Sequence, residues 1–124
     1  MSDEVLNSSD QLDVESADGC RQIAEWLIES GSPDVAIDWL RRAIEIEPNN
    51  CQLHLSLGGA YFELRCWQAA VVTFGAAVRL SPDSTIALYG YGSACANMGR
   101  LKEAIASLES ARSLQSNALN LNQH

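Results

Sequence analysis

The chain has 124 residues, enough for one domain, and its hydrophobic fraction of 47% is ordinary for a globular protein. The formal net charge is −8, and a single lysine without any basic cluster makes nucleic acid and anionic membranes poor partners. The stretches without a charged residue, such as 66–78 and the longer 84–99, are too short for a membrane span of roughly 20 residues, and we do not expect the acidic start MSDEVLNSSD to be a secretory signal. We therefore expect a cytoplasmic protein that binds neither nucleic acid nor membrane.

Residues 1–16 form the first segment and hold five acids and no base. Such a segment is too polar to fold alone, so we expect it to be disordered. It could act as a tethered plug in a groove, as a partner-binding tail, or as a solubilising extension.

An internal repeat with a period of 34 residues follows and covers residues 17–118. Within each unit, apolar residues recur at helical spacing twice, which predicts a helical hairpin. The units are 17–50, 51–84 and 85–118, and residues 119–124 are a C-terminal tail. The matched columns are Ile23/Leu57/Tyr91, Ala24/Gly58/Gly92, Leu27/Tyr61/Cys95, Ala36/Ala70/Ala104, Leu40/Phe74/Leu108, Ala43/Ala77/Ala111 and Ile46/Leu80/Leu114.

Local signals divide each unit in the same places. A good N-cap precedes each first helix, turn residues separate the two helices, and proline ends the second helix of units one and two. These signals are Ser16, Asn50 and Ser84; Gly31-Ser32-Pro33, Arg65-Cys66 and Gly99-Arg100; and Pro48 and Pro82.

This pattern resembles the tetratricopeptide repeat family over residues 17–118. Unit two, from LGGAYF to AAVVTFGAAVRLSP, matches the family at every column, and MGRLKEAI in unit three is typical of its turn and second helix. The departures are Cys20 and His54 where an early aromatic is common, Cys95 for tyrosine, and Ser116 for proline. The resemblance implies an all-α fold, a right-handed superhelical solenoid of three helical hairpins.

The resemblance also implies that the first helix of each unit lines a concave wall. This wall is polar in unit one and apolar in units two and three, where exposed Leu55, Phe62, Ile86 and Tyr89 would surround pockets left by small residues. The alternative is that these residues pack against the N-terminal segment or adjacent helices. The predicted partner-binding groove comprises Arg21, Gln22, Glu25, Ile28, Gln52, Leu55, Ser56, Gly59, Phe62, Ile86, Tyr89, Gly90 and Ser93.

Two neighbouring glycines in the first helix of unit two have different predicted roles. Gly58 belongs to the small-residue column, where the two helices of one hairpin approach closely. Gly59 lies on the opposite side and removes a side chain between Leu55 and Phe62, which would hollow the wall. Gly75 has no small-residue column, and nothing in the sequence explains it.

Family members that bind the C-terminal carboxylate of heat-shock chaperones use Lys, Asn and Arg on this wall. The corresponding places here hold Arg21, Glu25, Ser56, Ile86 and Gly90. Only Arg21 could serve, and Glu25 would repel a carboxylate. We therefore expect a groove for apolar anchors of an extended or helical segment.

Nothing in the sequence indicates catalysis or a cofactor. The four cysteines form no C-x-x-C pair and the two histidines lie near none of them, so we expect free thiols, no metal and no disulfide. His54 has no acid at helical spacing, and we expect no enzyme.

The predicted function is that of a protein–protein interaction module, an adaptor or a chaperone-like protein, with another protein as its partner. The alternative is a structural scaffold that self-associates into a homo-oligomer through its apolar C-terminal edge, which contains Leu101, Ile105 and Leu114.

Overall fold

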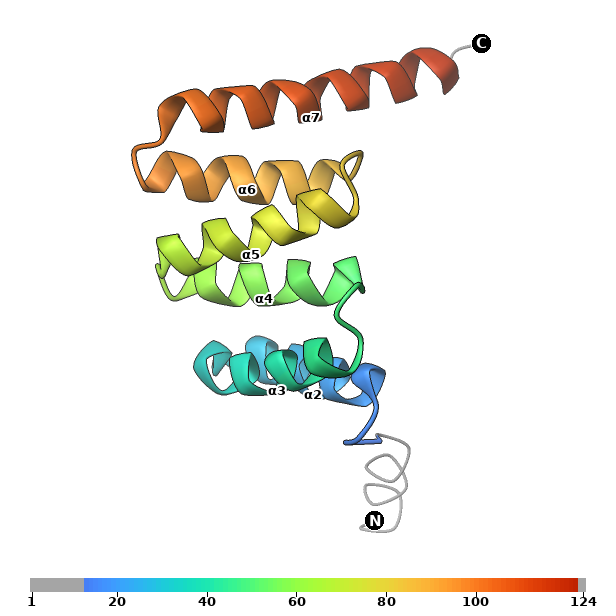
Figure 1. The fold of residues 1–124 in the computed structure, drawn as a ribbon, viewed down its shortest axis with the longest axis vertical. Helices are drawn as coiled ribbons and strands as arrows, with labels where there is room; N and C mark the ends of the chain where they lie inside the picture. Colours follow the sequence, from blue (N-terminus) through green and yellow to red (C-terminus); the bar gives the residue numbers. More distant parts are fainter. Residues whose placement is uncertain (1–12, 123–124) are drawn as a thin grey trace.

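Successive antiparallel helices make up the fold of the computed structural model, which describes residues 13–122. The helical hairpins stack in chain order along the long axis of the molecule, from α2 and α3 at one end to α7 at the other (Figure 1). The six helices of this part of the chain are α2 (Ala17–Glu29), α3 (Pro33–Ile46), α4 (Cys51–Glu63), α5 (Trp67–Leu80), α6 (Thr85–Asn97) and α7 (Leu101–Asn122). They form the three predicted hairpins, α2–α3, α4–α5 and α6–α7.

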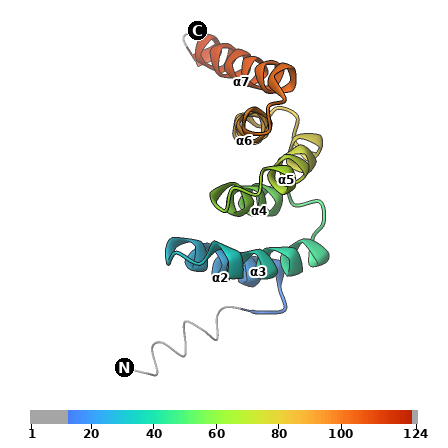
Figure 2. The same cartoon turned by 90° about the vertical axis from the view of Figure 1, so that its left-hand side faces the viewer.

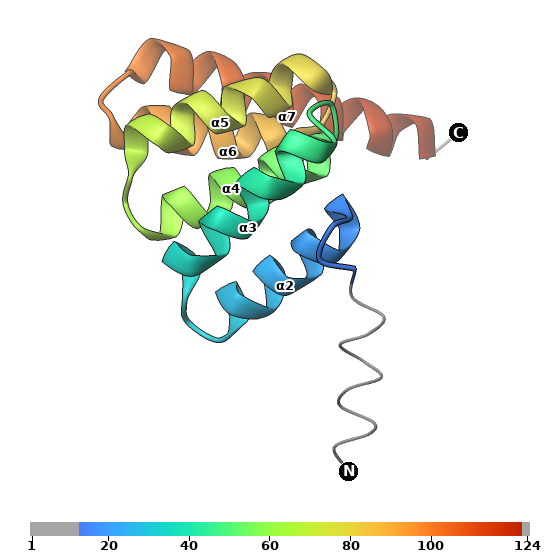
Figure 3. The same ribbon diagram turned by 60° about the horizontal axis from the view of Figure 1, so that its bottom comes forward.

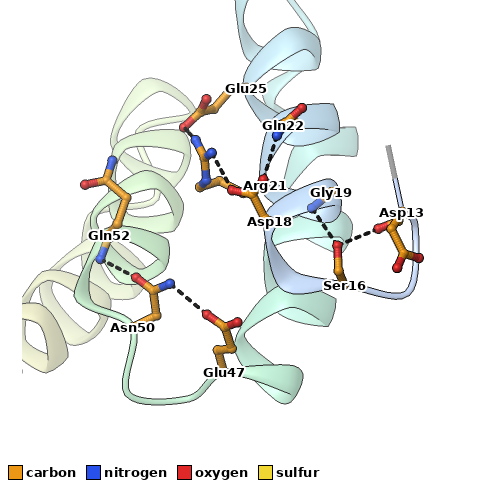
Figure 4. Close-up of polar contacts among 10 residues, drawn as sticks. All are labelled: Asp13, Ser16, Asp18, Gly19, Arg21, Gln22, Glu25, Glu47, Asn50 and Gln52. Carbon is orange, nitrogen blue, oxygen red and sulfur yellow. Dashed lines mark hydrogen bonds and ion pairs between the residues drawn. The ribbon is translucent and has the colours of Figure 1, made fainter. Parts of the chain in front are cut away.

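The three predicted N-caps are confirmed. The side-chain oxygens of Ser16, Asn50 and Ser84 accept hydrogen bonds from the backbone N–H of Gly19, Gln52 and Ala87, at 3.0, 3.0 and 3.2 Å. Figure 4 shows the first two of these contacts. Because each bond satisfies a backbone donor that the helix itself leaves unpaired, a cap of this kind contributes about 1 kcal/mol.

The turn inside each hairpin is the same motif three times. Its central residue has a positive φ, at 90° for Gly31, 60° for Arg65 and 81° for Gly99. The following residue donates its backbone N–H to a carbonyl five residues earlier, as from Cys66 to Tyr61 at 2.9 Å. This is the Schellman ending of a helix, which normally uses glycine. Arg65 therefore occupies a left-handed conformation that suits glycine better.

The second helix of the third hairpin does not end where those of the first two end. Pro48 and Pro82 follow two residues after α3 and α5. The equivalent of these prolines is Ser116, which keeps its backbone N–H, so α7 continues to Asn122. The residues set apart by sequence as a tail therefore begin as helix, over 119–122.

The core includes most of the repeat columns, together with residues outside them such as Leu53 and Val71. Gly58 and Gly92 of the first helix face Phe74 and Leu108 of the second, and most of the matched positions are buried. The last column differs from this expectation, because Ile46 and Leu80 at the helix ends are 44% and 37% exposed.

The helices form two layers. Helix α4 contacts both α2 and α6, whereas α3 and α5 each contact the first helix of the following hairpin. We call α2, α4 and α6 the inner helices, and α3, α5 and α7 the outer helices. Successive hairpins are turned relative to one another, so that α6 is seen end-on in a view that shows α3 from the side (Figure 2). The result is an all-α superhelical solenoid.

The described part of the N-terminal segment, residues 13–16, forms a turn against α2. The backbone N–H and hydroxyl of Ser16 both donate to the carbonyl of Asp13, each at 2.9 Å. A methyl group on Gly19 would lie 2.0 Å from that carbonyl oxygen, so Gly19 is required for this approach. Figure 3 shows this stretch at the start of α2. The rest of the segment predicted to be disordered, 1–12, lies outside the described residues.

No helix within residues 13–122 combines the length and apolarity that a bilayer span requires.

Candidate functional site

The wall of the inner helices is the candidate site. All thirteen predicted groove residues lie on α2, α4 or α6, and none of them is buried. These three helices are neighbours, because α4 contacts both α2 and α6. That this wall binds a partner stays a prediction.

The α2 end of the wall is charged and internally paired. Arg21 donates to Asp18 at 2.7 Å and to Glu25 at 2.8 Å, while Gln22 donates to Asp18 at 2.6 Å. Figure 4 shows the guanidinium lying between the two carboxylates. The hydrogen bonds from Arg21 and then Gln22 lower the pKa of Asp18. The one cation of the wall is therefore already engaged by two carboxylates.

A hollow of about 360 Å³ lies between α4 and α6, and we call it the inner hollow. Five of its lining residues belong to the predicted groove. Glu63 and Phe74 line it as well, although the repeat pattern does not assign them to this surface. The full lining is Gly59, Phe62, Glu63, Phe74, Tyr89, Gly90 and Ser93.

The floor of the inner hollow is one ring held between two glycines. A methyl group on Gly58 would lie 2.9 Å from Cε1 of Phe74, and one on Gly90 only 2.4 Å from the same atom. Phe74 thus reaches from α5 between the two inner helices. By contrast, a methyl group on Gly59 would meet no atom within 4 Å. Gly58 and Gly59 therefore lie in the surroundings predicted for them, while Gly90 is also a packing residue.

The four apolar side chains of the predicted groove differ in exposure. Ile86 is 67% exposed and Tyr89 39% exposed. The prediction that Leu55 and Phe62 are exposed is wrong in degree, because both are half-buried by packing against the core. The ring of Phe62 also meets Trp67 edge-on at a centroid distance of 4.9 Å, so Trp67 is a packing residue.

Two further contacts involve tyrosines of the third hairpin, one within that hairpin and one with α5. The hydroxyl of Tyr89 donates to Oε1 of Gln115 on α7 at 3.0 Å, which connects the wall to the last helix. Gly75 on α5 faces Tyr91 on α6, and a methyl group there would lie 3.5 Å from Cε1 of that ring. This is an ordinary contact distance, so the packing does not require glycine at position 75.

A second apolar surface lies on α7, and we call it the terminal face: Leu101, Ile105 and Leu108. Leu101 is 62% exposed and Ile105 56% exposed. The equivalents of Ile105 in the first two hairpins, Ile37 and Val71, are buried at 9% and 5% exposure. The terminal face is therefore the surface on which a further hairpin would stack. Glu109 and Arg112 border a hollow of about 270 Å³ beside it.

The histidine and the cysteines of the described residues do not form a cluster. Nε2 of His54 lies 2.8 Å from the carbonyl oxygen of Pro48. All four cysteines are free thiols: Cys20 and Cys95 are buried, Cys51 is half-buried and Cys66 is exposed. Burial raises the pKa of Cys20 and of Cys95. Across residues 13–122, no three His, Cys, Asp or Glu side chains are gathered as metal ligands.

The sequence of this chain is similar to those of known repeat proteins. Tetratricopeptide repeat models match residues 20–50 and 55–118. Superkiller complex protein 3 of Mus musculus is 32% identical over 79 residues, which is 64% of this chain and 5% of that protein. Superkiller protein 3 of Saccharomyces cerevisiae is 27% identical over 82 residues, 66% of this chain and 6% of that protein. The chain thus spans only about a twentieth of the length of these relatives.

Solved structures share the fold. The second TPR of Spaghetti (RPAP3), bound to the HSP90 peptide SRMEEVD, matches with a TM-score of 0.78 at 20% identity, over 87% of this chain and 98% of that one. MamA matches with a TM-score of 0.82 at 21% identity, over 88% of this chain and 64% of that one. One repeat model covers more than half of the chain, and the hairpins, caps and turns recur with its period. The chain belongs to the tetratricopeptide repeat family.

Proposed function

We propose that this chain is a protein–protein interaction module, an adaptor or chaperone-like protein without catalytic activity, that binds a peptide segment or helix of a partner on its inner wall. The observation that carries this proposal is the exposed apolar surface of Ile86 and Tyr89, which lie one turn apart on α6, with Tyr89 lining the inner hollow. Apolar surface that is contiguous and surrounds a depression usually marks an interaction site. The RPAP3 domain, which has a similar fold, binds a peptide, and this supports the proposal that a domain of this fold binds a peptide segment.

The charge of the wall indicates which peptides do not bind. SRMEEVD is acidic, whereas the only cation of the inner helices, Arg21, is already paired with Asp18 and Glu25. A carboxylate would have to displace one of these partners and approach the other. The proposed partner segment is therefore not the acidic terminus of a heat-shock chaperone.

Partner capture from a native lysate, quantified by mass spectrometry, tests the proposal with two wall variants. Ile86→Glu changes an exposed residue, and Gly59→Trp adds a ring where the backbone faces open space. Both are expected to lose the partners that the wild type captures while circular dichroism and the melting temperature stay nearly unchanged. Leu55→Glu is less suitable because Leu55 packs against the core. If both variants capture the same proteins as the wild type, the proposal is wrong.

A second candidate function is self-association as a structural scaffold. The terminal face favours it, because Ile105 is exposed where its equivalents Ile37 and Val71 are buried by the next helix. A second copy of the chain could cover this surface and place Glu109 and Arg112 at the border of the contact.

A further inference from the structure

The lining of the inner hollow combines two kinds of group. Three aromatic side chains, Phe62, Phe74 and Tyr89, lie around it together with the carboxylate of Glu63. The glycine at position 59 keeps the space between them open. The face of an aromatic ring attracts a cation, and a carboxylate does so more strongly at close range.

The carboxylate of Glu63 makes no ion pair within residues 13–122, where every ion pair of 4.0 Å or less involves Arg21. Glu63 is exposed and lies at the end of α4, so its charge faces solvent at the rim of the inner hollow. No cationic side chain lines the inner hollow. Within residues 13–122, Glu63 therefore has no cationic partner within 4.0 Å, and the rings that line the inner hollow share it with no cationic side chain.

The charge of the inner helices extends this imbalance. Helices α2, α4 and α6 hold four carboxylates (Asp18, Glu25, Glu29, Glu63) and one cation (Arg21), a net charge of −3. The outer helices hold five of each sign, a net charge of zero: Asp34, Asp38, Glu45, Glu103 and Glu109 against Arg41, Arg42, Arg79, Lys102 and Arg112. Within the helices, the net negative charge thus belongs to the inner ones, −2 on α2 and −1 on α4, and the turn after α4 adds Arg65.

A hollow of similar size that lies mainly against the outer helices provides a contrast. Its volume is about 390 Å³, and its lining contains Arg41, Glu45, His54 and Arg79 but no phenylalanine, tyrosine or tryptophan. A carboxylate there already has cationic side chains in the same hollow. The inner hollow differs because it joins several rings with a carboxylate and has no cation in its lining.

We propose that the inner hollow binds the side chain of a lysine or arginine of the partner segment. The methylene stem of that residue would lie against Phe62, Phe74 and Tyr89, and its charged group would reach Glu63 at the rim. This inference rests on the proposed function and specifies the partner segment. The segment would carry an apolar residue that contacts Ile86 and, next to it, a basic residue that enters the inner hollow. An apolar side chain in the inner hollow would gain the contact with the rings but would leave Glu63 without a counter-charge. An acidic side chain would be repelled.

Peptide selection on the full-length wild-type protein, from a random library displayed on phage, tests the inference without requiring an identified partner. The selected peptides are expected to share one Lys or Arg beside an apolar residue. Replacing that basic residue by norleucine, which keeps the stem and removes the charge, is expected to weaken binding about tenfold in fluorescence anisotropy. Glu63→Gln is expected to weaken binding of the basic peptide about three- to fivefold, and to leave the norleucine peptide unaffected.

Glu103→Gln is the matched control, because it removes the same charge from an exposed residue of the outer helix α7. Binding of both peptides should be unchanged in this variant. If the selected peptides have only apolar anchors, or if Glu63→Gln and Glu103→Gln behave alike, the inner hollow does not bind a cation. The proposed function still stands in that case, provided that Gly59→Trp abolishes peptide binding. If no peptide is selected, or if Gly59→Trp binds normally, both proposals are wrong.

Discussion

The ring of Phe74 occupies the space that a side chain on Gly90 would need. The two residues belong to different hairpins, and a methyl group on Gly90 would come within 2.4 Å of Cε1 of Phe74. In the other hairpins the same column as Phe74 holds leucine, at Leu40 and Leu108. The larger phenylalanine ring in unit two therefore requires a residue without a side chain at position 90 of the next unit.

This relationship predicts opposite effects for two glycine substitutions. Gly90→Ala is expected to destabilise the protein by about 1–2 kcal/mol, because overpacking at Phe74 outweighs the gain in helix propensity. Gly59→Ala is expected to stabilise it by about 0.5–1 kcal/mol, since its methyl group meets no atom. Urea unfolding of the two variants measures both values, and equal shifts of the two would contradict this packing of Phe74.

The turn at Arg65 is a site where glycine should be better than the native residue. Its φ of 60° lies in the left-handed region, where Gly31 and Gly99 stand in the equivalent turns. Arg65→Gly is expected to raise the free energy of unfolding by about 0.5–1 kcal/mol, after the entropic cost of glycine in the unfolded chain. Arg65→Ala removes the same charge but keeps a Cβ atom. It should give no such gain in thermal unfolding.

The acidic peptide SRMEEVD should not bind this protein. Arg21 is held by Asp18 and Glu25, and no other cation lies on the inner helices. Isothermal titration should detect no heat of binding for the wild type. A heat of binding that disappears in Arg21→Ala would show that Arg21 can leave its two partners, and would contradict this expectation.

The four thiols should react in the order of their exposure. Cys66 is exposed, whereas Cys20 and Cys95 are buried and their pKa values are raised by burial, so they hold less of the reactive thiolate at a given pH. Iodoacetamide at mildly alkaline pH should therefore label Cys66 first and Cys20 and Cys95 only after unfolding. Mass spectrometry of digested protein gives the order, and early labelling of Cys95 would show that α6 opens readily.

Self-association through the terminal face can be separated from the function of the inner wall. If the terminal face pairs with a second copy, light scattering will show a mass that rises with concentration in the wild type and stays monomeric in Ile105→Asp. Val72→Asp is the control, because Val72 is also apolar and is 62% exposed but lies on α5. A wild type that is monomeric at all concentrations would exclude this second function.

The sequence predicts the hairpins well because their boundaries depend on local chemistry that repeats. The caps at Ser16, Asn50 and Ser84 and the turns near Gly31 and Gly99 need only nearby backbone groups. The length of α7 is predictable in part, because Ser116 has the backbone N–H that proline lacks and so does not end the helix.

The lining of the inner hollow is less predictable. Periodicity assigns Phe74 to the core column of Leu40 and Leu108, and it does not reveal that a longer ring extends into the next unit. Helical spacing does not assign Glu63 to the face of α4 that forms the wall. Glu63 lines the inner hollow as the last residue of α4. The same spacing overestimates the exposure of Leu55 and Phe62, since packing against the core covers them in part.

The position of Phe74 makes the inner hollow and the junction between hairpins two and three a single cooperative unit. In a repeat protein each hairpin is stabilised by its nearest neighbours, so the coupling between hairpins sets how much of the array folds or opens together. Here one buried ring contributes to that coupling and also lines the inner hollow. Evolution of a different surface at this place would therefore change the folding cooperativity of the array as well.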